Sequence, residues 1–263
     1  MNAKSNQNQS SRAKGLGPAV LLATLVVLAG ARPVPADLAA NSLKNPRVLS
    51  PAATPYGKTY GEWSAEHWKW TFALPVDHHP LLDETGADVA QGQSGPVWFL
   101  GGTFTSTTSG GVTVGSATRD CTVPTGKALF FPIIDNECST LEGNGTTDAE
   151  LRSCAKFFQD HAHDLTCTVD GVPIQNLDSY RVQSPLFTYG PLPDNNLLES
   201  FGLNAPAGST SPSVSDGVFV MLAPLSAGGH TIHFSGALSL SAANGDPFDL
   251  EFRLDITYNL TVK

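Results

Sequence analysis

Two pairs of titratable side chains in this 263-residue chain are spaced so that they could do chemistry together. The first pair, Asp135 and Glu137, is two residues apart at the end of an expected strand, so both point the same way if the strand continues. Either of them, together with Glu62 or Glu66 from a neighbouring helix, could form the pair of carboxyl groups of a glycosidase, which lie about 5–9 Å apart. With Asn136 they could instead hold calcium. The simpler interpretation is a solvated strand end without chemistry.

The second pair, His78 and His79, is adjacent in an expected loop beside Asp77. Imidazole and carboxylate together can build a metal site, but neighbouring side chains usually diverge and seldom bind one ion. His161 and His163 would point to different sides of a helix and are weaker candidates. A structural role is the alternative for every histidine. The candidate metal ligands are therefore His78, His79, Asp135 and Glu137.

Common catalytic signatures are missing from the sequence. There is no His-Glu-x-x-His, the usual pattern of zinc proteases. The stretch Gly92-Gln93-Ser94-Gly95 lacks the second glycine of a nucleophile elbow, and Pro96 disfavours the helix that would follow it. The sequence therefore gives no firm reason to expect covalent chemistry.

A cluster of aromatic residues is the best candidate for ligand binding. All four tryptophans lie between residues 63 and 98, and tryptophan faces stack on sugar rings and other flat ligands. A helix over 60–74 would place several of these rings on one face. Because an aromatic stripe on a helix is more often core, packing is the alternative. The candidate ligand-binding residues are Trp63, His67, Trp70, Asp77, His79 and Trp98.

The element that must carry these sites is a β-structure built on the last strand, 248–262. Eight apolar side chains alternate there with polar ones, which predicts a strand with one dry face. Similar runs at 232–240 and 218–222 predict three consecutive antiparallel strands, with Asn244-Gly245 in the second link.

Other segments fill out a mainly β protein. A capping box at Thr147–Glu150 begins a second helix, and the proline-rich stretch 191–215 reads as a long surface loop. Further strands are expected at 97–100, 117–123, 127–134, 166–169, 172–174 and 180–189. The sum is an antiparallel two-sheet sandwich, jelly-roll-like, with two inserted α-helices. A closed barrel is the alternative.

The first 36 residues have the features of a secretory signal peptide: a basic start, an apolar run at 16–31, and small residues before Asp37. The run is shorter than the ~20 residues of a membrane-spanning helix, so no stable span is expected after its removal. We expect an extended leader at 37–58 and a single domain at 59–263. The location would be secreted or periplasmic.

Charge and cysteine content limit the kinds of partner and of cross-link that we expect. Removing 1–36 takes away four of 15 basic residues and none of 24 acidic ones, which leaves a formal charge of −13. Such acidity argues against nucleic acid. The four cysteines, without any Cys-x-x-Cys, favour two disulfides over zinc. The spacing favours Cys121–Cys138 and Cys154–Cys167.

These features favour an exported ligand-binding β-sandwich without covalent chemistry. The ligand would be a small molecule, a carbohydrate or a cell-surface polymer, and calcium is the cofactor considered. The alternative is a secreted hydrolase or lyase that acts on a polysaccharide with carboxylates or a metal ion. A structural or partner-binding envelope protein is a third class, and the sequence leaves the oligomeric state open.

Overall fold

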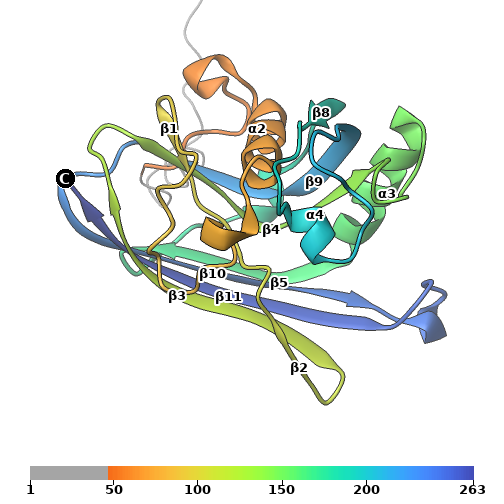
Figure 1. Cartoon of the computed structure of the whole chain (residues 1–263). Helices are drawn as coiled ribbons and strands as arrows, with labels where there is room; N and C mark the ends of the chain where they lie inside the picture. Colours follow the sequence, from red (N-terminus) through yellow and green to blue (C-terminus); the bar gives the residue numbers. More distant parts are fainter. Residues whose placement is uncertain (1–46) are drawn as a thin grey trace, which may run out of the picture. The chain divides into compact units, whose positions relative to one another are not determined.

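The computed structural model describes residues 47–263, so the expected signal peptide (1–36) and the first part of the leader (37–46) lie outside the described residues. The described part of the chain forms two β-sheets that pack together, with three α-helices beside them (Figure 1). The predicted two-sheet, mainly β architecture is therefore confirmed. The described end of the leader holds an isolated bridge from Val48 to Leu222 and a short 3-10 turn.

The C-terminal sheet contains the strand on which the prediction was built. Its order is β2-β3-β11-β10-β5-β6. The tight pairing of β10 with β11 confirms the predicted hairpin, although β11 begins at Leu250 and Phe248 is exposed. The strands are β2 (Thr107–Ser109), β3 (Val112–Val123), β5 (Ala162–Val169), β6 (Val172–Pro173), β10 (Gly228–Leu240) and β11 (Leu250–Val262).

The second sheet, here called the β4 sheet, has the order β1-β4-β9-β7, and β8 also pairs with β9. Its long central strands β4 and β9 are buried along most of their length. The strands are β1 (Val97–Phe99), β4 (Ala128–Ser139), β7 (Arg181–Gln183), β8 (Phe187–Tyr189) and β9 (Ser211–Leu222).

Strand direction and partners differ from the expectation in three ways. Both sheets are mixed, because β3 runs parallel to β11 and β1 runs parallel to β4. The predicted strand 218–222 is part of β9, which lies in the β4 sheet and not beside β10. The expected strand at 180–189 is broken into β7 and β8, with Pro185 between them.

Helices α2 (Tyr60–Phe72) and α3 (Asp148–Asp160) both pack on β4 and β9, and a short α4 (Leu197–Ser200) lies in the loop expected at 191–215. Thr147 caps α3 through the predicted capping box, and Thr59 caps α2 in the same way. No helix within residues 47–263 is long and apolar enough to cross a bilayer.

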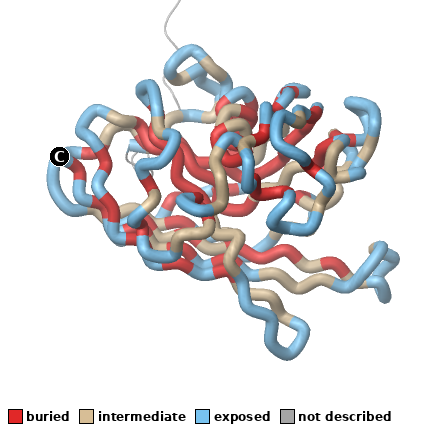
Figure 2. Tube along the Cα trace, viewed as in Figure 1, coloured by how far each residue is buried: buried red, intermediate tan, exposed pale blue. Residues whose placement is uncertain are grey.

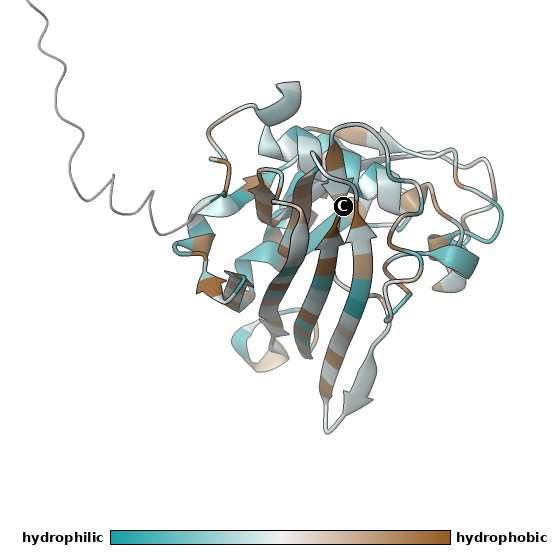
Figure 3. Ribbon diagram, turned by 90° about the vertical axis from the view of Figure 1, so that its left-hand side faces the viewer, coloured by the Kyte–Doolittle hydropathy of each residue, from teal (hydrophilic) through white to brown (hydrophobic). Residues whose placement is uncertain are grey.

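The two faces of the β4 sheet have different coverings. Phe131 stacks on Phe234 of β10, so this face meets the C-terminal sheet. The opposite face carries Phe219, which lies against His67 of α2. Buried segments concentrate between the layers, and apolar bands repeat along the long strands (Figures 2 and 3). The α2 face of β4 is therefore the place where polar side chains from the strand can meet those of the helix.

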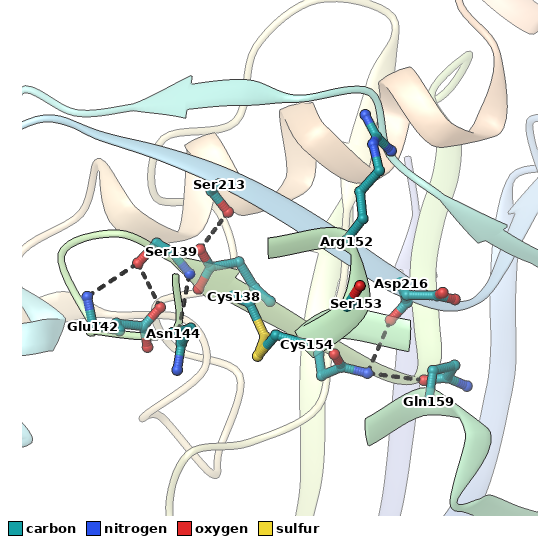
Figure 4. Close-up of a disulfide and its surroundings, with 12 residues drawn as sticks. Cys138, Ser139, Glu142, Asn144, Arg152, Ser153, Cys154, Gln159, Ser213 and Asp216 are labelled. Carbon is teal, nitrogen blue, oxygen red and sulfur yellow. Dashed lines mark hydrogen bonds between the residues drawn. A yellow bond between two sulfur atoms is a disulfide. The ribbon is translucent and has the colours of Figure 1, made fainter. Parts of the chain in front are cut away.

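The cysteines form one disulfide, Cys138–Cys154, which ties β4 to α3 (Figure 4). The expected pairs Cys121–Cys138 and Cys154–Cys167 are therefore wrong. Cys121 and Cys167 are buried free thiols. They lie on β3 and β5, which are separated by β11 and β10. Three spacings of about 4.8 Å between neighbouring strands place their Cα atoms beyond the roughly 7 Å that a disulfide can bridge. Burial raises the pKa of both thiols to about 12, which disfavours thiolate chemistry.

Replacing Cys138 and Cys154 together with alanine is expected to lower the free energy of unfolding by about 3 kcal/mol. The reason is the freedom that the unfolded chain regains when a loop closed over a separation of 16 residues is opened. Urea unfolding with and without reductant measures the loss. Reductant should destabilise the natural chain to the level of the double variant and leave the variant unchanged. Equal stability of oxidised and reduced protein would contradict this account.

Candidate functional site

Strand β4, which carries the candidate site, is longer than the sequence pattern predicts. The strand was expected to end at Ile134, but it continues to Ser139. Asp135 and Glu137 consequently lie inside the strand, on one face as their spacing predicts. An irregularity in the pairing with β9 leaves Ile133 without a partner, and such a bulge resets which side chains point to which face.

A small cavity opens on this part of β4, with a volume of about 230 Å³. We call it the Asp135 cavity. It brings together two residues singled out from the sequence, His67 and Asp135. Its wall is otherwise mostly apolar and comes from α2, β4, the C-terminal sheet and the segments before and after β1. The lining residues are His67, Trp68, Leu81, Gly102, Thr103, Phe104, Ser106, Pro132, Ile134, Asp135, Leu238, Phe252 and Leu254.

Asp135 is the one acidic residue of the cavity wall. Its Oδ2 atom is buried and has no hydrogen-bond partner within residues 47–263. Burial raises the pKa of the carboxyl to about 7. The Trp68 indole N–H lies near enough to lower this pKa somewhat, but the two groups do not meet in hydrogen-bond geometry, so both stay unpaired within the described residues. The space for the side chain exists because its partner on β9 is Gly217, where a Cβ atom would lie 2.3 Å from Asp135 Cβ. Near neutral pH the carboxyl can therefore either give or accept a proton.

His67 and Trp68 add further polar atoms to the same wall. His67 Nε2 lies 2.9 Å from the carbonyl oxygen of Leu100. Since a carbonyl can only accept, this nitrogen donates, and Nδ1 is left as a buried acceptor without a partner in the described chain. Burial lowers the pKa of His67 to about 4, so the ring is neutral at neutral pH. The Trp68 indole N–H is likewise buried and unpaired within the described residues.

The loop that closes the cavity is held by a buried arginine. The Arg119 side chain on β3 is fully buried and donates to the carbonyl oxygens of Asp83, Gly101 and Gly102 and to the hydroxyl of Tyr258. Gly102 lines the cavity, and Tyr258 in turn donates to Gly101. Arg119 therefore fixes the position of one cavity wall without contacting the cavity.

Glu137 belongs to a separate buried network that also contains Ser213 and Glu142. Its carboxyl accepts a very short hydrogen bond from Ser213, and Ser139 donates to Glu142 at 2.7 Å. Burial, and then the neighbouring Glu142 carboxyl, raise the pKa of Glu137 well above its usual range. Glu137 does not line the Asp135 cavity. The structure therefore places the two carboxyls of the predicted pair in different surroundings.

Of the two helix carboxylates, Glu62 belongs to the capping box of α2, and Glu66 lies on the surface of α2, where it pairs with Lys58 and Lys69 at 3.2 and 3.1 Å. Neither residue lines the Asp135 cavity. A glycosidase pair that combines Glu66 with Asp135 or Glu137 gains no support from this placement.

The three expected tryptophans lie in the hydrophobic core. Trp63, Trp70 and Trp98 are each 7% exposed. Trp63 donates to the carbonyl of Pro55, and Trp70 donates to that of Gln91. Trp63 and Trp70 both pack against Phe99, and Trp98 is buried. Stacking of these rings on a sugar therefore remains a prediction that this arrangement does not support.

The loop residues are also separated from one another. His79 is buried and bonded to the carbonyl of Thr71, whereas His78 is exposed and paired with Asp88. Asp77 accepts from the Asn195 amide. Within residues 47–263 no three His, Cys, Asp or Glu side chains converge as metal ligands would. The expected metal set of His78, His79, Asp135 and Glu137 is thus spread over different places.

Comparisons with known proteins add no assignment. No protein-family model matches the chain, and no curated protein or solved structure is detectably similar to it. The geometry of the Asp135 cavity is therefore the best indication of function.

Sequence reasoning missed most of the cavity wall. Nothing in the sequence distinguishes Trp68 from the neighbouring tryptophans, and Phe104 and Ser106 lie in a Gly-, Ser- and Thr-rich stretch without a period. Leu238, Phe252 and Leu254 were expected on dry strand faces, but alternation does not say which part of such a face stays uncovered. One available signal was Pro132, because a proline within a strand indicates an edge or a bulge.

Proposed function

We propose that this chain is a binding protein whose partner places an apolar group with one hydrogen-bond donor in the Asp135 cavity. The observation that carries the proposal is the Asp135 carboxyl, which has a buried oxygen without a partner beside an apolar wall. Buried polar atoms are nearly always hydrogen-bonded in folded proteins. Ligand sites typically combine an apolar lining with a few polar groups that fix orientation.

The size of the cavity limits what can enter it. A cavity of about 150 Å³ holds benzene, which has six non-hydrogen atoms, so 230 Å³ is room for about nine. This is below the roughly 300–1,000 Å³ of most small-molecule sites. A phenol or an indole ring system, with a single hydroxyl or N–H group, fits both the volume and the unpaired carboxyl.

Phenol and indole are the probes that test the proposal. We expect both to bind with a Kd of about 1 mM, and toluene, which has no donor, to bind about tenfold more weakly because Asp135 then stays unpaired. Isothermal titration calorimetry measures the affinities. Proton uptake or release on binding, seen by comparing buffers, would report the titration of Asp135.

A pair of serine variants provides the control. Ser106→Trp places a large ring at the exposed rim of the cavity and should abolish phenol and indole binding. Ser109→Trp makes the same change on the exposed strand β2, away from the cavity, and should leave binding unchanged. If neither probe bound, or if both variants behaved alike, the proposal would fail.

An acid–base enzyme is the second candidate, and it uses the same residues. A carboxyl that titrates near neutral pH and a neutral imidazole in one cavity could act as acid and base. Chromogenic glycosides would test the polysaccharide version: turnover that Asp135→Asn removes would favour the enzyme over the binding protein.

The proposal also places the protein outside the cytoplasm. The basic and apolar start of the chain carries this part, and the Cys138–Cys154 disulfide is compatible with it. Secretion of a reporter fused to residues 1–36 would test it. A reporter that stayed in the cytoplasm would count against export.

A further inference from the structure

Part of β4 has a free edge next to the Asp135 cavity. On one side β4 pairs with β9 along its length. On the other side β1 pairs with β4 only from Ala128 to Phe130, and Leu100 extends this by one hydrogen bond to Phe130. Beyond that point no strand within residues 47–263 pairs with this side of β4.

The direction of the backbone groups follows from the register. Ser215 on β9 accepts from the Ser184 amide and donates to the Ser184 hydroxyl, so its backbone groups point toward β7. Its partner on β4 is Glu137. In an antiparallel ladder, Glu137 and Ser215 are therefore a pair that exchanges no backbone hydrogen bonds. The N–H and C=O of Glu137, and of Asp135 two residues earlier, therefore point to the free edge.

Both ends of this edge are unsuited to pairing with another strand. At one end Ser139 exchanges two hydrogen bonds with Asn144, which imitates a strand partner. At the other end stands Pro132, which has no N–H to offer. Between them the backbone groups of Asp135 and Glu137 have no hydrogen-bond partner within the described residues. Residues 135–137 are also only half-buried, so this stretch is a strand edge open to a partner.

We propose that the natural ligand is an extended polypeptide that pairs with the free edge of β4 and inserts a tyrosine or tryptophan side chain into the Asp135 cavity. The inference rests on the proposed function and names the class of partner. Main-chain pairing would satisfy the groups of Asp135 and Glu137, as in other strand-addition complexes. A tyrosine or tryptophan side chain has an apolar body and a single donor at its tip, which suits the cavity and its carboxyl.

Charge favours a foreign cationic peptide over a second copy of this chain. Two copies that paired through their β4 edges would bring Asp135 and Glu137 of one close to the same carboxyls of the other. Like charges placed opposite each other weaken a strand pair. The whole chain has a formal charge of −9, which would also favour association with a lysine-bearing peptide.

The test uses end-blocked peptides of about six residues, the usual length of a strand. They carry threonine and lysine around a central tyrosine, phenylalanine or alanine. Calorimetry should show tyrosine binding about tenfold more tightly than phenylalanine, because only tyrosine can donate to Asp135, and alanine not binding. The Ser106→Trp variant should lose binding, and Ser109→Trp should keep it.

Backbone pairing has two signatures of its own. Methylation of single peptide nitrogens should abolish binding at every second position and be tolerated between, because alternate amides of a strand face its neighbour. Hydrogen exchange should slow on binding at the amides of Asp135 and Glu137. The amide of Asn136, which faces β9, is the internal control.

The outcomes separate the inference from the proposed function. Phenol binding without peptide binding would leave the cavity proposal standing and overturn the polypeptide. Peptide binding without the period-two methylation pattern and without protection at Asp135 and Glu137 would also overturn it. Dimerisation that lysine-bearing peptides do not reverse, with those amides protected, would assign the edge to a second copy and reject the foreign peptide.

Discussion

Replacing Arg119 with methionine is expected to lower the free energy of unfolding by about 4 kcal/mol, although Arg119 does not line the Asp135 cavity. The guanidinium is fully buried, and all its acceptors are uncharged oxygens, those of Asp83, Gly101, Gly102 and Tyr258. Methionine fills similar space but has no hydrogen-bond donor, so these oxygens would lose their donors in a buried site. Each buried group left unsatisfied costs about 1–3 kcal/mol.

An opposing effect comes from the cost of burying the guanidinium, whose Nη2 atom has no hydrogen-bond partner within residues 47–263. Burial of a charge is itself costly, and apolar replacement of a whole buried ion pair is often neutral or stabilising. That result requires both partners to be replaced. Here the acceptors are mostly backbone carbonyls, which remain after the substitution. We therefore expect the loss of donors to exceed the relief from removing the charge.

Urea unfolding measures the effect, with two comparison variants. Arg119→Lys keeps the charge but cannot reproduce the forked set of donors, so its loss should be similar or slightly smaller. Arg253→Met removes an exposed arginine from the outer face of β11 and should change stability by less than about 0.5 kcal/mol. A stable Arg119→Met protein would show that water or a shifted loop satisfies the carbonyls.

Local patterns in the sequence predicted local structure well. The alternation at 248–262 gave β11 to within two residues, and the capping box at Thr147 gave the start of α3. The Asn244-Gly245 pair correctly placed the link between β10 and β11. Each of these signals is contained in a few neighbouring residues, so it does not depend on the rest of the fold.

Long-range pairing was not accessible in the same way. A period of two predicts a strand but does not identify its partner, so the parallel neighbours β3 and β1 could not be foreseen. The prediction of the disulfides failed for the same reason, because the spacing of Cys138 and Cys154 along the chain does not show that α3 folds back onto β4.

The site was predicted in part, and the failures have physical causes. Asp135 and His67 were singled out for their chemistry, and the fold does bring them to one cavity. Asp135, Asn136 and Glu137 are polar, which wrongly suggested that the strand had ended. Inward-pointing polar residues break the pattern on which strand prediction depends. Arg119 broke the pattern similarly, between the buried Ala117 and Cys121.

The stability of the protein is expected to fall between about pH 4 and pH 7 because of Asp135. In the unfolded chain this carboxyl ionises near its ordinary pKa of 3.8, whereas burial raises the pKa to about 7 in the folded protein. Between these values the unfolded state gains a solvated charge that the folded state cannot accommodate. The contribution to stability is therefore complete below about pH 4 and is lost as the pH rises to 7.

Replacing Asp135 with asparagine should remove this dependence. A difference of about 3 pH units at 1.36 kcal/mol each amounts to about 4 kcal/mol, an upper limit if water can reach the carboxyl. The variant and the natural chain should therefore be about equally stable near pH 4. The advantage of the variant should grow as the pH rises and reach about 2–4 kcal/mol near pH 8. Urea unfolding across this range measures the trend. Glu84→Gln, a change of an exposed carboxyl, is the control and should show no trend of this size.

Glu137 has to be separated from Asp135 because its raised pKa acts in the same direction. The variants Asp135→Asn and Glu137→Gln should each flatten part of the pH dependence, and only Asp135→Asn should weaken binding of phenol or of the tyrosine peptide. Asp135 lowers the stability of the protein near neutral pH, and a role in recognising a ligand in the cavity would account for its presence. If Asp135→Asn stabilised the protein and left binding unchanged, the unpaired carboxyl would have no role in recognition.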